Sequence, residues 1–153
     1  MNVANLLATT GLAANRLELE ITEAVLIRDD EAALTMLRHL RDIGVGIALD
    51  DFGTGYSSLS YLQRFPFDKI KIDRCFINDI AEAEGSSSIV QAVINIARAR
   101  NMTTTAEGVE TEEQREMLLS FGCTEMQGDL FSRARPVSEI RMLLSQANSI
   151  AAA

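Results

Sequence analysis

Short apolar runs alternate with longer amphipathic stretches along most of the chain. Residues 17–21 alternate strictly, with leucine or isoleucine at the odd positions and glutamate at the even positions Glu18 and Glu20. This period of two predicts a half-buried strand. Apolar or β-branched runs of similar length predict further strands at residues 45–49, 70–72 and 103–106, and another strand is expected at residues 124–127, after Gly122.

The segments between these runs have helical spacing. Asp30 can cap a helix that ends at Gly44, with inward positions at Ala33, Met36, Leu37, Leu40 and Ile43. A second long helix, to Arg100, would begin at serine caps in residues 86–88 and bury Ile89, Val90, Val93, Ile96 and Ala97. Other helices are expected at residues 58–63, 111–121 and 138–146, the second of them capped by Thr111.

Strand followed by helix, repeated five times, predicts a parallel sheet with right-handed crossovers. The chain has 153 residues and no Pro/Gly/Ser-rich linker, so we expect one domain or one piece of a domain. Two α/β folds fit this pattern: a doubly wound sheet, and an incomplete TIM-type (β/α)8 barrel of about five parallel strands.

Polar side chains stand at or near the carboxyl end of every predicted strand. They are Glu20, Asp50, Asp51, Lys71, Asp73, Glu107 and Gln127. A doubly wound sheet gathers its site at one switch point, whereas a barrel collects residues from many strands. The distribution therefore favours the incomplete barrel.

Each of these residues also has a purely structural interpretation, which the sequence leaves open. Glu18 and Glu20 could form the exposed face of a strand, and Asp50 with Asp51 could be turn residues and a helix cap. Lys71 and Asp73 could form a solvated ion pair, and Glu107 with Glu110 could belong to the N-terminal turn of a helix. That all four structural interpretations are correct at once, at successive strand ends, is less expected than that any one of them is correct.

The adjacent carboxylates Asp50 and Asp51 repel each other, so a cation is expected beside them. Carboxylate and amide oxygens are the ligands that Mg²⁺ and Mn²⁺ prefer, and Glu20 and Glu107 add to the supply. His39, in the middle of a predicted helix, is expected to face solvent rather than bind metal.

Composition and charge exclude several classes of protein. Hydrophobic residues make up 47% of the chain, enough for a substantial core, and the formal net charge is −8. Such a charge argues against nonspecific binding of DNA or of an acidic membrane. No apolar run is long enough for a membrane span, and the start of the chain does not read as a signal peptide. The two isolated cysteines, Cys75 and Cys123, are expected to be reduced thiols in a cytoplasmic protein.

Five segments in order resemble the EAL-domain family of bacterial cyclic di-GMP phosphodiesterases. They are LELEITE at residues 17–23, DDFGTGYSSL at 50–59, KIKIDR at 69–74, AEGVET at 106–111, and QG with LFSR at 127–133. The resemblance implies cyclic di-GMP as substrate and two metal ions, Mg²⁺ or Mn²⁺. It implies that Glu20 binds metal, that Asp50 bridges the two ions and that Asp51 binds the second.

The resemblance also implies catalytic and supporting roles for other residues. Lys71 would contact the nucleophilic water, Asp73 would support that site, and Glu107 would act on the metal and water network as general base. Gln127 would lie near the substrate and water. Glu23 would steady the loop that follows Asp51.

Part of the family pattern has no counterpart here. The Glu-Ala-Leu segment and the asparagine ligand of the next strand are missing, and a complete barrel needs about 250 residues. Residues 1–153 are therefore expected to be the C-terminal portion of an EAL domain. The remaining barrel strands are expected to come from a homo-oligomer or from another segment.

Three functions follow from these features. The first is metal-dependent hydrolysis of cyclic di-GMP to linear pGpG. The second is a noncatalytic module that binds cyclic di-GMP or a partner protein, because first-strand ligands are missing. A distant third is an enolase-like enzyme in which Mg²⁺ acts with a lysine base, although the run from Asp50 to Tyr56 counts against it.

Overall fold

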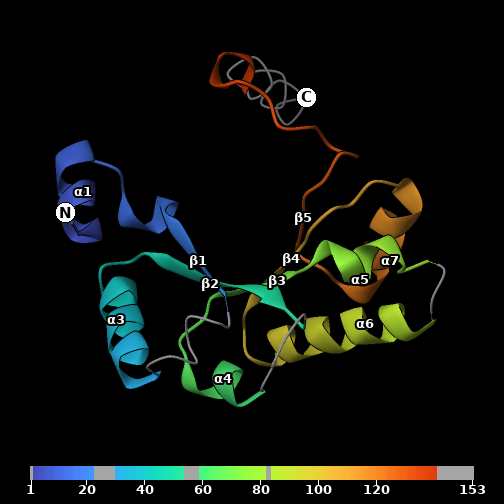
Figure 1. Ribbon diagram of the computed structural model, residues 1–153, viewed down its shortest axis with the longest axis horizontal. Coiled ribbons are helices and arrows are strands. Elements are labelled where there is room, and N and C mark those ends of the chain that lie inside the picture. The colour runs from blue at the N-terminus through green and yellow to red at the C-terminus, as the bar shows by residue number, and fades with distance from the viewer. Residues whose placement is uncertain (1, 23–29, 54–58, 82–83, 141–153) are drawn as a thin grey trace.

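The computed structural model describes residues 2–22, 30–53, 59–81 and 84–140. Within these ranges five parallel strands form one sheet, with helices in the connections (Figure 1). The elements, in chain order, are α1 (Val3–Thr10), η1 (Ala14–Arg16), β1 (Glu18–Thr22), α3 (Asp30–Asp42), β2 (Gly46–Phe52), α4 (Leu59–Arg64), β3 (Lys69–Ile72), α5 (Arg74–Asn78), α6 (Glu84–Ala99), β4 (Thr103–Ala106), α7 (Glu112–Phe121) and β5 (Glu125–Met126).

The order of the strands decides between the two folds that the sequence allowed. It is β1-β2-β3-β4-β5, the same as the order along the chain. A doubly wound sheet reverses its strand order at a switch point, whereas a barrel adds each strand beside the previous one. The fold is therefore an incomplete TIM-type barrel, and the prediction is confirmed.

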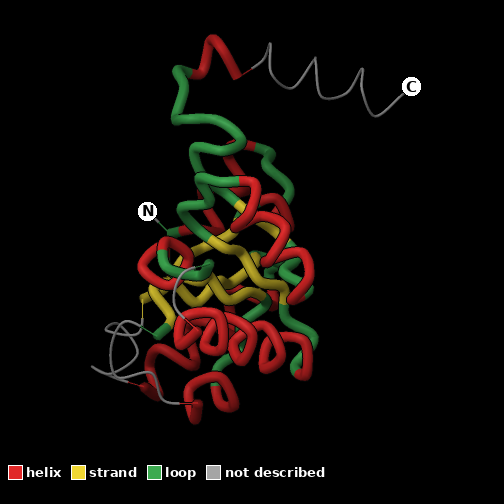
Figure 2. Tube along the Cα trace, turned by 90° about the vertical axis from the view of Figure 1, so that its right-hand side faces the viewer, coloured by secondary structure: helices red, strands yellow, loops and turns green. Residues whose placement is uncertain are grey.

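Helices cover one face of the sheet (Figure 2), and the core consists of apolar side chains from the strands and these helices. Leu37 from α3, Leu49 from β2, Ile70 from β3 and Leu118 from α7 are completely buried. Burying such a side chain stabilises the fold by roughly 1.5–3 kcal/mol. None of the helices within the described ranges is long and apolar enough to cross a membrane.

Strand β2 continues past the end predicted for it. The apolar run stops at Leu49, yet the strand includes Asp50 and Asp51 and ends at Phe52. Its register against β3 shifts between Leu49 and Phe52, and Asp51 has a positive φ of 55°. A bulge with one residue in the left-handed region re-aims the strand, so the acidic pair lies within β2 rather than after it.

Other helix predictions need correction. Helix α6 begins at Glu84, so the serines at 86–88 lie inside it instead of capping it. Three residues predicted to face inward are instead substantially exposed: Met36, Ile43 and Ile89. Helix α5 was not predicted, because five residues are too few for a periodic pattern. Of the helix expected at residues 138–146, only the first turn falls within the described residues.

Candidate active site

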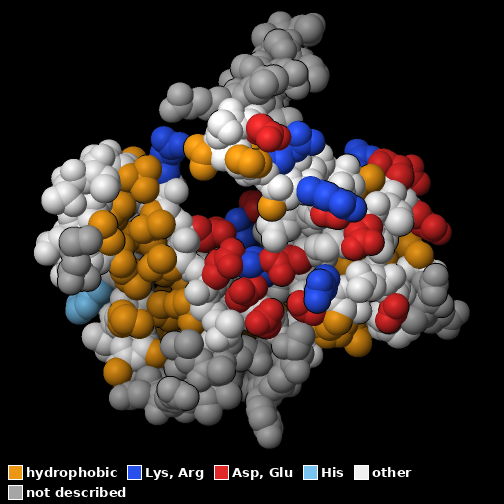
Figure 3. Space-filling view, turned by 45° about the horizontal axis from the view of Figure 1, so that its top comes forward, with side chains coloured by type: hydrophobic (Ala, Val, Ile, Leu, Met, Phe, Trp, Pro, Cys, Tyr) orange, Lys and Arg blue, Asp and Glu red, His pale blue; other side chains and the backbone are white. Residues whose placement is uncertain are grey.

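Lys71 lies at the centre of a cluster of carboxylates from three other strands. Its Nζ atom is 2.8 Å from Glu20 Oε2, in the middle of β1, and 2.7 Å from Glu107 Oε1, just after β4. It is also 3.0 Å from Asp50 Oδ1 on β2. The Lys71 side chain is only 7% exposed. Figure 3 shows acidic side chains gathered around basic ones in the middle of the molecule.

Strand alternation explains why these side chains meet. Parallel strands end at the same edge of the sheet, and side chains two apart on a strand share a face. Glu20 and Lys71 therefore project on the face opposite the helices, as Glu107 and Gln127 do from the ends of β4 and β5. Gln127 joins the cluster through its amide, since Nε2 donates to Glu107 Oε1 at 2.8 Å.

The carboxylates keep Lys71 charged. Burial on its own lowers the pKa of this ammonium group, but the contacts with its three acidic partners outweigh burial and raise the pKa well above its ordinary value. Lys71 is therefore fully protonated at neutral pH. A protonated lysine cannot serve as the base that the enolase-like alternative requires.

Asp50 carries an oxygen that is not satisfied by hydrogen bonding. Its Oδ1 atom is buried and lies within ion-pair distance of Lys71 Nζ, yet the angles do not meet those of a hydrogen bond. A buried carboxylate oxygen without a hydrogen bond is costly and favours a further cation. Its donor chemistry suits Mg²⁺ or Mn²⁺.

The remaining acidic candidates lie at the border of this cluster. Asp51 is exposed at the bulge of β2. Asp73 accepts a hydrogen bond from the Cys75 backbone N–H at 2.9 Å and caps α5, and its contacts with the Cys75 thiol and then with this N–H lower the pKa of its carboxyl group. Lys71 pairs across the sheet instead of with Asp73, so the solvated ion pair considered for the two is wrong. Glu23 and most of the glycine loop at 54–58 lie outside the described residues.

The described part of the chain contains no group of three or more His, Cys, Asp or Glu side chains arranged to hold a metal ion. Lys71 Nζ occupies the space between the carboxylates. The oxygens of Glu20, Asp50 and Glu107 nevertheless have the chemistry of a hard-cation site, and the unsatisfied Asp50 oxygen agrees with it.

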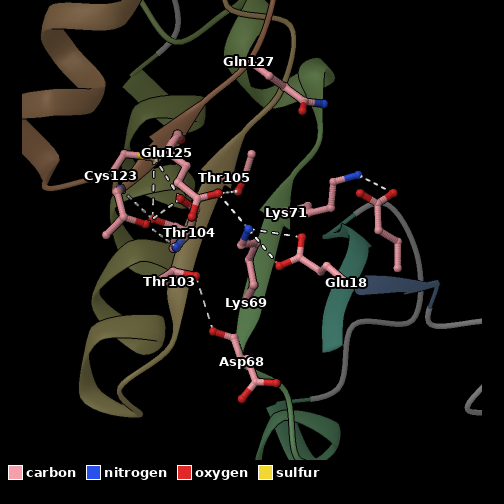
Figure 4. Close-up of polar contacts among 12 residues, drawn as sticks. Glu18, Asp68, Lys69, Lys71, Thr103, Thr104, Thr105, Cys123, Glu125 and Gln127 are labelled. Carbon is pink, nitrogen blue, oxygen red and sulfur yellow. Dashed lines mark hydrogen bonds and ion pairs between the residues drawn. The ribbon is translucent and has the colours of Figure 1, made fainter. Parts of the chain in front are cut away.

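A second set of polar contacts lies one step further down the strands and was not predicted. Lys69 Nζ is 2.9 Å from Glu18 Oε2 and 2.7 Å from Glu125 Oε2 (Figure 4). Thr105 Oγ1 donates to the same Glu125 oxygen at 2.9 Å. In the sequence, this second set is indicated only by its spacing, because Glu18, Lys69 and Glu125 each stand two positions before a predicted site residue.

Comparison with known families agrees with this geometry. A family model described as EAL domain matches residues 1–134. The chain belongs to the EAL domain family. The Pseudomonas aeruginosa protein MucR, named a bifunctional diguanylate cyclase/cyclic di-GMP phosphodiesterase, is 45% identical over 139 residues, which make up 91% of this chain and 20% of that protein.

Two solved EAL structures resemble the chain closely. The P. aeruginosa MucR phosphodiesterase in complex with c-di-GMP has a TM-score of 0.85 at 46% identity, over 90% of this chain and 56% of that one. The Klebsiella pneumoniae BlrP1 manganese/cy-diGMP complex at pH 9.0 has a TM-score of 0.79 at 40% identity, over 84% of this chain and 33% of that one. The chain spans about a fifth of the length of the curated relatives it matches.

Proposed function

We propose that the chain is the C-terminal portion of an EAL domain that hydrolyses cyclic di-GMP to linear pGpG. The observation that carries the proposal is the convergence of Glu20, Asp50 and Glu107 on Lys71 at the carboxyl ends of the strands. Active sites of barrel enzymes form at this end. The cyclic di-GMP complexes of MucR and BlrP1 support the choice of substrate.

Glu20, Asp50 and Asp51 would hold Mg²⁺ or Mn²⁺. When bound, such ions supply positive charge to a phosphodiester and lower the pKa of a coordinated water. The manganese complex of BlrP1 supports a divalent ion, without fixing which metal acts here.

The other residues act through hydrogen bonds and charge. Glu107, oriented by the Gln127 amide, would accept the proton of the attacking water. Lys71 would orient that water and offset negative charge on the phosphate, roles that suit a protonated ammonium. Asp73 would support the site from the start of α5. Glu23 would steady the loop after Asp51.

The incomplete barrel needs further strands. They would come from a second copy of the chain or from another segment, which would also supply the missing first-strand ligands. The free cysteines, Cys75 and Cys123, support a cytoplasmic location.

A noncatalytic module that binds cyclic di-GMP or a partner protein is the second candidate. Lys71 fills the space between the carboxylates, and the described residues offer no ready-made group of three metal ligands. The acidic cluster would then be a remnant of a catalytic ancestor.

One assay separates the two functions. The purified chain and the complete protein that contains it are incubated with cyclic di-GMP and Mn²⁺, and the products are separated by chromatography. Linear pGpG from the complete protein supports the phosphodiesterase. Binding of cyclic di-GMP by equilibrium dialysis without any linear product would replace it with the noncatalytic module.

A further inference from the structure

Two layers of polar side chains lie one above the other on the inner face of the sheet. The lower layer consists of Glu18, Lys69, Thr105 and Glu125. The upper layer consists of Glu20, Lys71, Glu107 and Gln127. In Figure 4 Lys69 lies between Glu18 and Glu125, with Lys71 further along the same strand.

Each lower residue stands two positions before an upper one, which lies on the same strand or just past its end. Glu18 precedes Glu20 on β1, Lys69 precedes Lys71 on β3, and the same spacing relates Thr105 to Glu107 and Glu125 to Gln127. Residues two apart on a strand share a face and are joined by a stiff extended backbone. A contact that holds the lower side chain in place therefore also limits the position and direction of the upper side chain.

The lower layer bridges strands that do not pair directly. Lys69 on β3 connects β1 with β5, and the Lys69 side chain is only 14% exposed. Strand β5 is two residues long and, among the described strands, pairs only with β4, so its backbone ladder is short. The side-chain bonds to Glu125, from Lys69 and Thr105, add to the Thr124–Thr104 and Gln127–Ala106 hydrogen bonds that place this strand.

We infer that Lys69 is a positioning residue, which through Glu18 and Glu125 sets the places of Glu20 and Gln127 around Lys71. The inference rests on the proposed function only in treating the upper layer as the catalytic site. The described ion pairs of Lys69 go to Glu18 and Glu125 and not to the upper residues, so it acts through the backbone of its partners' strands.

The first test measures positioning without any metal or substrate. Lys69→Met removes the charge and keeps the length of the side chain. The backbone N–H of Gln127 donates to the Ala106 carbonyl oxygen at 2.9 Å, so its exchange rate reports on the end of β5. By hydrogen exchange read by NMR, we expect this amide to exchange about tenfold faster in Lys69→Met, with the middle of α6 changed by less than about twofold.

Arg41→Met is the matched control. Arg41 pairs with Asp68, the neighbour of Lys69, at 3.2 Å, but its side chain is 53% exposed and belongs to neither layer. We expect no selective change at Gln127 in this variant. If Lys69→Met does not fold, Glu125→Gln, which keeps shape and loses charge, decides the question by the same pattern of exchange.

The second test links the two layers to the site. Titration calorimetry with Mn²⁺ on the complete protein should show about tenfold weaker binding in Lys69→Met and no change beyond about twofold in Arg41→Met, as for other residues that orient metal ligands. Equal acceleration of exchange at Gln127 and in α6, or unchanged Mn²⁺ affinity, would overturn the inference. Absence of Mn²⁺ binding by the unmodified protein would instead count against the proposed function, and hydrogen exchange would still decide the role of Lys69.

Discussion

The environment of Lys71 combines a desolvation cost with three favourable contacts. Removing an ammonium group from water is expensive, and the charge stays because Glu20, Asp50 and Glu107 surround it. Asp50 and Glu107 are each 20% exposed, while Glu20 is half exposed. Lys71 therefore stabilises a set of like charges that would otherwise repel each other.

Replacing Lys71 by methionine should destabilise the fold. The three carboxylates would lose their common partner, and we expect a loss of about 2 kcal/mol in the free energy of unfolding, moderated by the solvent that reaches Glu20. Urea unfolding at low ionic strength measures it. Arg115→Met, which breaks the exposed pair with Glu112, should cost less than about 0.5 kcal/mol. Equal losses in both variants would contradict the central place of Lys71.

Cys75 should react with alkylating agents only at high pH. Partial desolvation of the Cys75 thiol and the neighbouring Asp73 carboxylate both disfavour the thiolate, which raises the pKa of Cys75 from 9.0 to about 11. In a Cys123→Ser background, the rate of reaction with iodoacetamide should rise with pH to a midpoint near that value. Asp73→Asn removes the negative charge, so its midpoint should move to lower pH. A midpoint near 9.0 in both proteins would refute the coupling of Cys75 to Asp73.

Sequence patterns predicted which residues form the site, but not which of these residues contact each other. Alternation and strand ends were enough to group Glu20, Asp50, Lys71, Glu107 and Gln127, and the structure brings them together. Which carboxylate meets the lysine depends on the register between strands distant in sequence, which no local pattern encodes. The lower layer was missed for the same reason.

Helix α7 shows an element fully specified by local sequence. Thr111 accepts a hydrogen bond from the Gln114 backbone N–H, the Gln114 side chain accepts one from the Thr111 N–H, and Gly122 ends the helix in the left-handed conformation. Gln114 is buried and also donates to the Ile77 carbonyl, which ties α7 to α5. These caps made the bounds of the helix predictable.

Removing the cap of α7 should have a moderate and local effect. Thr111→Ala leaves a helix N-terminal N–H group without its partner, and we expect a loss of about 1 kcal/mol in the free energy of unfolding. Thr111→Ser keeps the hydroxyl and should stay within about 0.5 kcal/mol of the unmodified chain. Denaturant unfolding compares the three proteins. Identical stability of all three would show that the capping box contributes nothing.

The bounds of elements without such caps were predicted unevenly. Strand β4 was found with its observed bounds, since its β-branched run is short and isolated. The end of strand β2 was predicted too early. Two adjacent carboxylates are typical of a strand end, and the sequence pattern did not indicate the bulge that keeps them within the strand. The start of α6 was placed too late, because serine is favoured at helix caps but is also tolerated inside helices, as it is here.

The whole molecule has an apolar hollow beside the first strand. It has a volume of about 1200 Å³ and lies between α1, β1 and α3, with Leu19, Ile21, Met36, Leu40 and Ile43 among its lining residues. In the described part of the chain, β1 pairs only with β2, so the hollow borders an open sheet edge. Open edges and apolar patches of this kind favour association with further protein.

The isolated chain should therefore associate. Size-exclusion chromatography with light scattering should show a mass above that of the monomer, and Met36→Glu should reduce it by placing a charge in the hollow. Leu119→Glu is the control, because Leu119 is equally exposed but lies on α7, away from the hollow. A stable, well-folded monomer of the unmodified chain would contradict this expectation.

The most direct test of the account is the turnover of cyclic di-GMP by the complete protein with Asp50 replaced by alanine. Asp50 combines a buried, unsatisfied oxygen with contact to Lys71. We expect Asp50→Ala to abolish formation of linear pGpG in the presence of Mn²⁺, and Asp42→Ala, at the exposed end of α3, to retain the unmodified rate. A near-normal rate in Asp50→Ala would contradict the proposed site.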